Sequence, residues 1–352
     1  MEIQEELFGK TSNGISVEKI SLINNHGLKL AILTYGGIIQ AIETPDEDGI
    51  FKDIVQGYDS IEGYEKDEYY MGAVVGPVAG RITHARIPIN DRIIQLEPNA
   101  GTHQLHGGPM GLHKKVWKAK AEKRQDSLRL ILTTEAKEGE SGYPGNRDFK
   151  TTYILNNKNQ LMIYFDATTD ADTVVNMTSH SYFNLSSQEN DGLDDHLIMI
   201  NALKTLATDE LLIPTGEFDY VLGKATNFSR GKLIGQGLKE QAEGFDHVYA
   251  INKEPGKFGI TAKVVHQKSG RVLELVTNQP ALVFYTNNYP DGSVIGKNGL
   301  PIISQGAFCI EPQHFPDSPN HPHFPSIALK AGDTYKSRSQ FTFGLASDEH
   351  HH

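Results

Sequence analysis

Residues 264–273 read Val-Val-His-Gln-Lys-Ser-Gly-Arg-Val-Leu, and this stretch sets the fold class that we expect for the chain. Two apolar pairs, Val264-Val265 and Val272-Leu273, stand on either side of Ser269-Gly270, a dipeptide that is typical of a turn. Two strands that are joined over so short a distance run antiparallel. The stretch therefore predicts a β-hairpin.

The same pattern recurs along the chain. Apolar residues return at every second position in short runs, as expected for strands that bury one face. Examples are Ile15/Val17, Ile20/Leu22, Leu28/Leu30/Ile32 and Leu128/Leu130/Leu132. Turn residues separate such runs at Asn90-Asp91, at Gln125-Asp126-Ser127 and from Asn156 to Asn159. These spacings predict antiparallel meanders.

Helical segments are scarce. The best candidate, Leu233 to Ala242, is short and contains two glycines, which leaves little material for the crossovers of a parallel sheet. No linker, charge block or internal repeat divides the sequence. We predict an all-β fold, one large antiparallel β-sandwich domain over residues 1–346, and a tail over residues 347–352. The tail ends in His350, His351 and His352, which are typical of a purification tag.

The composition argues against several classes of protein. Of the 352 residues, 38% are hydrophobic and 22% are charged, as in a folded globular chain. The net charge of -11 disfavours a nucleic acid partner. The single Cys309 cannot form an internal disulfide, the N-terminus lacks the features of a secretory signal, and no apolar run approaches the roughly 18 residues that cross a bilayer. We expect a cytoplasmic protein that binds neither nucleic acid nor membrane.

Two side chains are candidates for acid/base chemistry. Glu311 follows the apolar run Ala307-Phe308-Cys309-Ile310, and burial there would raise the pKa of its carboxyl toward neutrality, as a general base requires. A solvated position at the end of a strand is the alternative. His180 stands in a polar stretch that follows an apolar strand, and imidazole is well suited to donate a proton near pH 7. A purely structural histidine is the alternative there.

Other motifs favour a small polar ligand over a metal or a nucleotide. His103 and His106 are followed by two glycines, which suits a loop that approaches a ligand, and no cysteine or carboxylate lies at metal-ligand spacing. His321 and His323 alternate with proline and are interpreted as a surface loop. The glycines near position 80 match no phosphate-binding motif. Arg81 and Asp246 are a guanidinium and a carboxylate beside apolar residues, a combination suited to sugar hydroxyls.

Five segments, in this order, resemble the galactose mutarotase or aldose 1-epimerase family, and the resemblance extends from the N-terminal strands to Phe343. They are Val75-Gly76 to Ile82; Leu105-His106-Gly107-Gly108 with Val116-Trp117; Gly142-Tyr143-Pro144-Gly145-Asn146; Thr178-Ser179-His180-Ser181-Tyr182-Phe183-Asn184-Leu185; and Ile310-Glu311-Pro312-Gln313-His314-Phe315-Pro316-Asp317-Ser318-Pro319-Asn320. Leu212-Ile213-Pro214-Thr215-Gly216 and Gly244-Phe245-Asp246-His247 add two smaller marks.

The resemblance implies a β-sandwich with an open sugar cleft and an enzyme that interconverts the α and β anomers of a free aldohexose such as galactose or glucose, without metal or cofactor. The position of Glu311 would be the base and that of His180 the acid. The implied sugar contacts are Arg81, His106, Asp246 and Gln279, with Tyr182 and Phe284 as an apolar wall. One departure is Gly80, where many members of the family carry asparagine.

Several alternatives stay open at this point. A hexose-6-phosphate 1-epimerase of related fold would need an additional Arg/Lys clamp for the phosphate, and only Arg81 stands among the motif residues. A non-catalytic sugar-binding protein would need no matched acid and base. A glycosidase would need two catalytic carboxylates, and only Glu311 is placed by motif. Monomer and homodimer are both compatible with the sequence.

Overall fold

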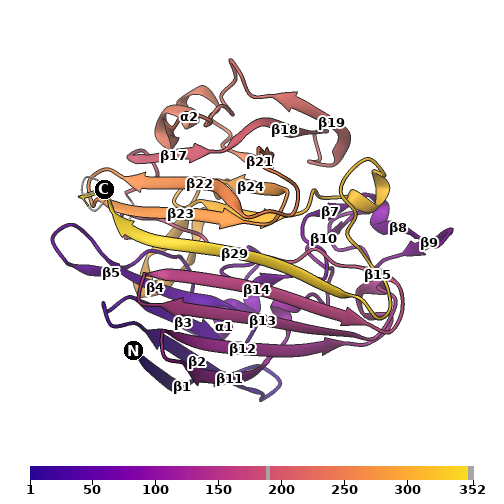
Figure 1. The fold of residues 1–352 in the computed structure, drawn as a ribbon, viewed down its shortest axis with the longest axis horizontal. Helices are drawn as coiled ribbons and strands as arrows, with labels where there is room; N and C mark the ends of the chain where they lie inside the picture. Colours follow the sequence, from indigo (N-terminus) through magenta and orange to yellow (C-terminus); the bar gives the residue numbers. More distant parts are fainter. Residues whose placement is uncertain (188–190, 348–352) are drawn as a thin grey trace.

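The computed structural model describes residues 1–187 and 191–347, and within these the fold is built almost entirely from antiparallel strands. Figure 1 shows the largest sheet, which has nine strands, running from β17 down to β11. Its strands, in spatial order, are β11 (Lys118–Lys123), β12 (Ser127–Ala136), β13 (Arg147–Asn156), β14 (Gln160–Thr169), β29 (Thr334–Leu345), β23 (Arg271–Thr277), β22 (Gly259–His266), β17 (His196–Ile200) and β20 (Lys232–Leu233). The prediction of an all-β, antiparallel fold is confirmed.

Two five-stranded sheets complete the main framework. The first contains β1 (Glu2–Lys10), β2 (Ser16–Ile23), β3 (Lys29–Leu33), β4 (Ile39–Pro45) and β5 (Phe51–Asp53). The second has the order β19 (Pro214–Tyr220), β18 (Ala202–Thr208), β21 (Asp246–Ile251), β24 (Ala281–Tyr285) and β27 (Cys309–Gln313).

Short two-stranded ladders connect these sheets. They pair β6 (Val74–Val75) with β16 (Thr178–Ser179), β7 (Arg81–Ile82) with β10 (Gln104–Leu105), β8 (Arg86–Ile89) with β9 (Arg92–Gln95), β15 (Thr173–Val174) with β28 (Ala328–Leu329), and β25 (Asp291–Ile295) with β26 (Pro301–Ile303).

The hairpin predicted for residues 264–273 is confirmed as β22–β23. Val264 pairs with Leu273 and Val265 with Val272 across the ladder. The predicted helix is shorter than expected: α2 spans Ile234–Glu240, because Leu233 is its extended N-cap residue and pairs with Leu197. A second helix, α1 (Ile61–Lys66), was not predicted; the side chain of Ser60 caps its N-terminus. No helix within the described residues is long and apolar enough to cross a bilayer.

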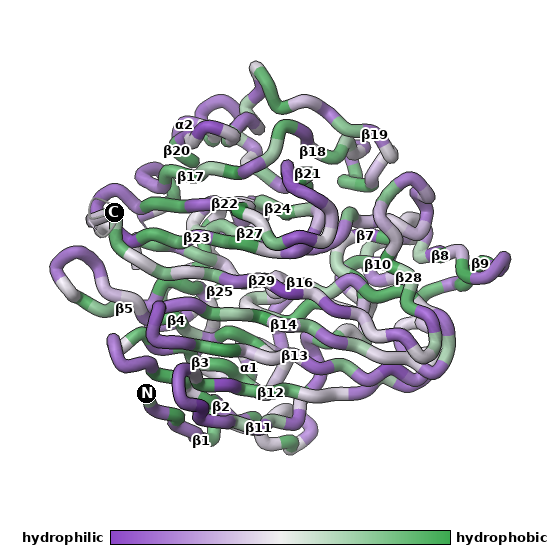
Figure 2. The backbone as a smooth tube through the Cα atoms, viewed as in Figure 1, coloured by the Kyte–Doolittle hydropathy of each residue, from purple (hydrophilic) through white to green (hydrophobic). Residues whose placement is uncertain are grey.

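A single hydrophobic cluster runs through all three large sheets. The alternating leucines of β12, Leu128, Leu130 and Leu132, are fully buried in it. It also contains side chains from β2–β4 and from β24 and β27, so the inner face of the nine-stranded sheet covers both smaller sheets. Figure 2 shows the apolar residues following the strands through the body of the molecule. The histidines at the end of the sequence lie outside the described residues.

Phe284 belongs to this core. On β24 it alternates with Val283 and Tyr285, so its side chain points to the opposite face of the sheet. Its ring packs against Phe228 and Phe245, with centroids 5.4 Å and 5.6 Å away. The expectation that Phe284 forms a wall for a sugar ring is therefore corrected: the side chain is fully buried and structural.

We predict that Phe284→Ala lowers the free energy of unfolding by about 3–5 kcal/mol, because it removes a fully buried aromatic ring and leaves a cavity. Equilibrium unfolding in urea, followed by tryptophan fluorescence, measures the change. Tyr289→Ala, at a side chain that is 65% exposed, is the comparison and should cost under about 1 kcal/mol. A loss at Phe284 as small as that at Tyr289 would contradict the assignment to the core.

Candidate active site

A pocket of about 160 Å³ lies on the face of the sheet formed by β21, β24 and β27. Alternate residues of these strands point into it, and loops from distant parts of the chain close its sides. These three strands contribute Asp246, Val248, Val283, Tyr285, Glu311 and Gln313. The ends of β7, β10, β18 and β19 contribute Arg81, Leu105, Thr208 and Pro214, and the loops contribute Glu68, Tyr69, Tyr70, Gly80, His106, His180, Tyr182, Leu212, Tyr289 and Pro316. Polar groups thus converge on a small, partly apolar space, which is the usual character of a ligand site.

A larger hollow of about 1350 Å³ lies on the outer face of the nine-stranded sheet. Its lining includes both acidic and basic side chains from β12, β13, β14 and β29. Arg338 in this hollow already pairs with Asp166 at 2.7 Å and lies over the ring of Tyr164. This hollow is the solvated outer surface of the sheet, and the smaller pocket is the candidate site.

Glu311 and His180 form a buried pair at the floor of the pocket. The distance from His180 Nε2 to Glu311 Oε1 is 3.4 Å, and the two residues are 5% and 2% exposed. Glu311 faces the pocket because its neighbour on β27, Ile310, fills the hydrophobic core on the other side of the sheet. The buried alternative for Glu311 is therefore the correct one, and the solvated strand end is excluded.

Hydrogen bonds set the spacing of this pair. The Thr178 hydroxyl donates to the carbonyl oxygen of Pro312 at 2.9 Å. Asn176 donates to the carbonyl oxygen of His314 and accepts from its amide, so the segment that carries His180 is fastened to β27 at two places. His180 itself donates its backbone N–H to Ala73.

Aromatic rings enclose the imidazole of His180. The Tyr182 ring stacks on it with centroids 5.0 Å apart, and the Tyr182 hydroxyl donates to the carbonyl oxygen of Tyr69. Tyr70 stacks at 6.1 Å, and His106 meets the ring edge-on at 5.4 Å. Cys309 Sγ lies 3.6 Å from His180 Nδ1. Low solvent access around the imidazole strengthens every electrostatic effect on it.

The pKa values of the pair are shifted in opposite directions. Burial raises the pKa of the Glu311 carboxyl well above its ordinary value, and the charge of Asp246 adds to the increase. Burial lowers the pKa of His180 to about 4, against the opposing effect of its own carbonyl group. Both shifts favour neutral side chains, so when the pair holds a single proton in the unliganded pocket, this proton resides on Glu311 and not on His180.

Arg81 enters the pocket from β7, and His106 enters it directly after β10, the strand paired with β7. The backbone N–H of Gly80 donates to His106 Nδ1 at 3.0 Å, and the N–H of His106 donates to the carbonyl oxygen of Gly80. Burial, together with the neighbouring His180, lowers the pKa of His106 well below its ordinary value, so the ring is neutral with its proton on Nε2. Nε2–H is thereby available as a donor in the pocket.

Asp246, the first residue of β21, is a hydrogen-bond acceptor on the pocket wall. Burial raises the pKa of its carboxyl to about 6, in opposition to the charge of Arg81, which lowers it. At neutral pH Asp246 is therefore ionised beside a guanidinium. This pair offers both an acceptor and donors for hydroxyl groups.

Gly80 occupies a position that only glycine fits. Its φ is +81°, and a Cβ atom there would lie 2.8 Å from Cβ of Pro316. Asparagine tolerates the backbone conformation but not this contact. The departure from the asparagine of many relatives is thus explained by the packing of Pro316.

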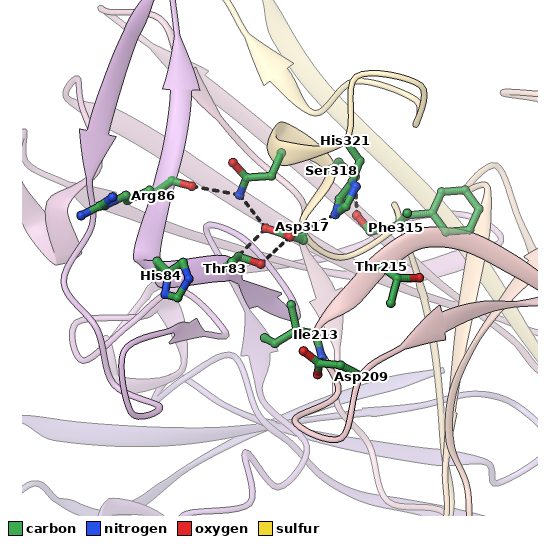
Figure 3. Close-up of polar contacts among 12 residues, drawn as sticks. Thr83, His84, Arg86, Asp209, Ile213, Thr215, Phe315, Asp317, Ser318 and His321 are labelled. Atoms are coloured by element: carbon green, nitrogen blue, oxygen red, sulfur yellow. Dashed lines mark hydrogen bonds and ion pairs between the residues drawn. The ribbon is translucent and has the colours of Figure 1, made fainter.

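A buried carboxylate, Asp317, anchors the loop that carries Pro316. As Figure 3 shows, the Thr83 amide and hydroxyl both donate to Asp317, and His321 contacts it from the other side at 3.2 Å. Asn320 donates to it as well. Asp317 is 1% exposed and is fully used by these contacts. His321 therefore has a structural role, as the interpretation of a rigid loop predicts.

With this geometry established, comparisons with known proteins become informative. A family model described as aldose 1-epimerase matches residues 18–342. The galactose mutarotase of Bos taurus is 37% identical over 98% of this chain and 100% of its own length.

The chain belongs to the aldose 1-epimerase family.

Solved structures of this family share the fold. A GalM/aldose epimerase homologue from C. elegans superimposes with a TM-score of 0.85 at 30% identity, covering 93% of this chain and 98% of the other. The galactose 1-epimerase from Lactobacillus acidophilus has a TM-score of 0.86 at 27% identity, covering 98% and 99%. Members of the aldose 1-epimerase family are isomerases, and so is this chain.

Two expected sugar contacts of the epimerase differ in the structure. Gln279 is buried outside the pocket, where its Oε1 lies 2.9 Å from His314 Nδ1 and its Nε2 donates to Asn278. It precedes β24 and is not among the residues that line the pocket. The structure thus corrects the expectation for Gln279, as it does for Phe284, and Gln313 is the glutamine that lines the pocket. The pocket brings together the other six predicted site residues: Arg81, His106, Asp246, Tyr182, His180 and Glu311.

Several residues that line the pocket of the epimerase were not predicted from the sequence. Gln313 was within reach of a simple rule, since it stands two positions after Glu311 on one strand and must share its face. Tyr285 required knowledge of the pairing of β24 with β27. Tyr70 and Tyr289 lie on loops, where no periodicity gives a signal.

One group of potential metal ligands exists among the described residues of the epimerase: His180, Cys309 and Glu311, with donor atoms within 4.8 Å of one another. Their two close contacts use different nitrogens of the imidazole, Nδ1 toward Cys309 and Nε2 toward Glu311. A single ion cannot replace both contacts without turning the ring. The arrangement therefore suits proton transfer better than metal binding.

We predict that the pH dependence of kcat follows the single shared proton. On acidification the pair gains a second proton near the pKa of His180, about 4, and both groups become acids. On alkalisation it loses its only proton near the raised pKa of Glu311, and both become bases. Polarimetric rates, corrected for the spontaneous reaction, should therefore be level above about pH 5, until the raised pKa of Glu311 is reached. An acid limb near pH 6.5 would contradict a lowered pKa of His180.

Asp246 should give a separate signal in KM. Its carboxyl is protonated below its pKa of about 6, which removes an ionised acceptor, so KM should increase as the pH decreases through 6 while kcat stays level. The same assay measures both constants. In Asp246→Asn the increase in KM should already be present at pH 7 and should no longer depend on pH in this range.

Proposed function

We propose that the protein is an aldose 1-epimerase that interconverts the α and β anomers of free aldohexoses, galactose among them, through acid/base opening of the ring by Glu311 and His180. The observation that carries the proposal is the buried contact of 3.4 Å between these two groups at the floor of a pocket of sugar-binding character. The names of the full-length relatives, galactose mutarotase and aldose 1-epimerase, support the substrate class.

Anomerisation moves two protons. The C1 hydroxyl loses one while the ring oxygen gains one, which opens the hemiacetal to an aldehyde that rotates and recloses on its other face. Glu311 as carboxylate would take the hydroxyl proton and His180 as imidazolium would protonate the ring oxygen, with the roles exchanged on closure. Positioned proton transfer of this kind contributes typically about 10²- to 10⁴-fold.

One proton shared by Glu311 and His180 is sufficient for this cycle. In the unliganded pocket the proton resides on Glu311, and its transfer across the 3.4 Å contact creates the reactive ion pair. Sugar hydroxyls that donate to Glu311 would favour this transfer because they stabilise the carboxylate. After ring opening, the proton lies on Glu311 again. One proton therefore shuttles between the two groups through each turnover.

The cycle requires a particular tautomer of His180. Nε2 is the nitrogen that faces Glu311, so Nε2 must give and take the proton while Nδ1 keeps its own. If Nδ1 lost its proton, donation from Nε2 would leave an imidazolate. Cys309 Sγ, 3.6 Å from Nδ1, can accept a weak hydrogen bond from Nδ1–H and so favours the productive tautomer.

The remaining polar groups would hold the sugar while the C1 centre reacts. Arg81 and the Nε2–H of His106 are donors, Asp246 is an acceptor, and the Tyr182 ring lies beside them. Val248 and Val283 form an apolar floor between them. Such a site binds a ring with hydroxyls on its edges and apolar faces.

We predict that Glu311→Gln lowers kcat by at least about 10²-fold, because the amide cannot accept the hydroxyl proton, while KM changes much less. His180→Asn should behave in the same way. Since the two groups act as a unit, the double variant should be little slower than the slower single one. Polarimetry on freshly dissolved α-galactose and α-glucose measures these rates.

The matched control for this prediction is Glu274→Gln on β23, the same change at a distance from the pocket, which should leave kcat within about twofold. A Glu311→Gln enzyme with near-normal kcat would place the base elsewhere. Wild-type protein that binds galactose without accelerating mutarotation would favour the non-catalytic sugar-binding protein.

We predict that free hexoses are better substrates than hexose 6-phosphates, by about tenfold or more in kcat/KM. Arg81 is the only lysine or arginine among the described residues that line the pocket, whereas Glu68, Asp246 and Glu311 bring carboxyl groups. A phosphate would meet repulsion without a cationic clamp. Comparing galactose and glucose with their 6-phosphates gives the ratio, and a preference for the phosphates would favour the hexose-6-phosphate epimerase instead.

A further inference from the structure

Gln313 carries a buried polar group whose protein partner is missing. The residue is 1% exposed, and none of the residues that the structure describes donates a hydrogen bond to its Oε1. Buried amide oxygens are normally hydrogen-bonded, and leaving one unpaired is costly. Gln313 is also the only residue on the pocket wall, within the described ranges, to which such an unpaired buried atom belongs.

The pairing of three strands gives Gln313 its place relative to the reacting groups. Across β27, β24 and β21, Cys309 is level with Tyr285 and Asp246. Glu311 is level with Val283 and Val248, and Gln313 is level with Ala281 and Ala250. Gln313 and Asp246 thus stand at opposite ends of the same sheet face, with Glu311 between them along the strand direction.

Distance decides which part of a sugar Gln313 can touch. Alternate residues of a strand are about 6.6 Å apart on one face, which is close to the width of a hexose ring with its hydroxyls. A sugar whose C1 hydroxyl contacts Glu311 can therefore reach Gln313 only with a hydroxyl remote from C1. The residues level with Gln313 on this sheet, Ala281 and Ala250, carry methyl groups that cannot hydrogen-bond the amide.

We propose that the side-chain amide of Gln313 hydrogen-bonds a substrate hydroxyl remote from the anomeric carbon, and that Gln313 is a specificity-determining residue of this enzyme. The inference rests on the proposed function, because it takes the ring to be seated with C1 at Glu311. An amide both donates and accepts, so it recognises a hydroxyl in either role. A site built to bind a hydroxyl discriminates against the analogue that lacks it.

We predict that removing the side-chain amide of Gln313 has opposite effects on the stability of the protein and on its affinity for sugar. Gln313→Leu and Gln313→Met remove the unpaired amide oxygen and fill the space with apolar atoms, so the thermal midpoint should equal or exceed that of the wild type. Removing one neutral hydrogen bond should weaken sugar binding about three- to tenfold. A glutamine that merely supported the fold would lose stability on the same change.

Isothermal titration calorimetry with 1,5-anhydrogalactitol or 1,5-anhydroglucitol, matching the hexose that the wild type turns over, tests the contact directly. These probes keep the ring and its remote hydroxyls but lack the anomeric hydroxyl, so no turnover occurs. Gln40→Leu is the matched control: Gln40 is a buried glutamine of β4 whose Nε2 donates to the Tyr58 carbonyl at 3.2 Å. It should lower the thermal midpoint and leave the affinity unchanged.

Polarimetry with the 2-, 3-, 4- and 6-deoxy sugars identifies the hydroxyl. The sugar that lacks the contacted group should have the same kcat/KM with wild type and with Gln313→Leu, whereas the other three should keep the three- to tenfold difference. Unchanged probe affinity in both Gln313 variants overturns the inference. So does an equal loss for all four deoxy sugars, which would indicate a change of pocket shape.

Failure of this inference is distinguishable from failure of the proposed function. A wild-type protein that accelerates mutarotation while the Gln313 variants bind the probe normally overturns only the role of Gln313. A wild-type protein that binds the probe, with Gln313-dependent affinity, but does not accelerate mutarotation overturns the proposed activity and leaves the contact standing.

Discussion

The active site depends on the burial of one carboxylate in the face of a sheet. On β27, the two-residue period sends Ile310 into the core and Glu311 into the pocket, so the strand cannot pack without enclosing an acid. Enclosure is costly for a charge and inexpensive for a neutral acid. The raised pKa of Glu311 is the result, and in the proposed cycle this carboxyl holds the proton that the pair exchanges.

The rest of the pocket compensates for this burial. His180 is brought within 3.4 Å of Glu311 by a segment fastened to β27 through Thr178 and Asn176. Rigid anchoring matters because proton transfer is sensitive to small changes in distance. Asp317 has a similar role after the end of β27. Its contacts with Thr83 and His321 fix the loop that packs Pro316 against Gly80. This packing supports the segment that carries the neighbouring donor Arg81.

Local patterns predicted a large part of this fold. The alternation of Leu128, Leu130 and Leu132 and the turn at Ser269-Gly270 predicted antiparallel strands, because both signals are contained within a few residues. Helix α1 was missed since its six residues are too few for a helical period to be recognised. The misplaced contact at Phe284 has a similar cause. Val283 and Phe284 are both apolar, so the sequence of β24 does not tell which of them faces the core.

By itself, the sequence determined the class of fold, the resemblance to a family and the types of side chain available for chemistry, since these depend on residue identity and short-range spacing. The tertiary structure alone decided which of them meet. His180 and Glu311 are 131 positions apart, and their contact exists only because β16 and β27 are fastened together. The pKa shifts follow from the burial that this packing creates. The unpaired amide of Gln313 likewise became visible only once its surroundings were known, because a missing partner is a property of the folded neighbourhood and not of the residue.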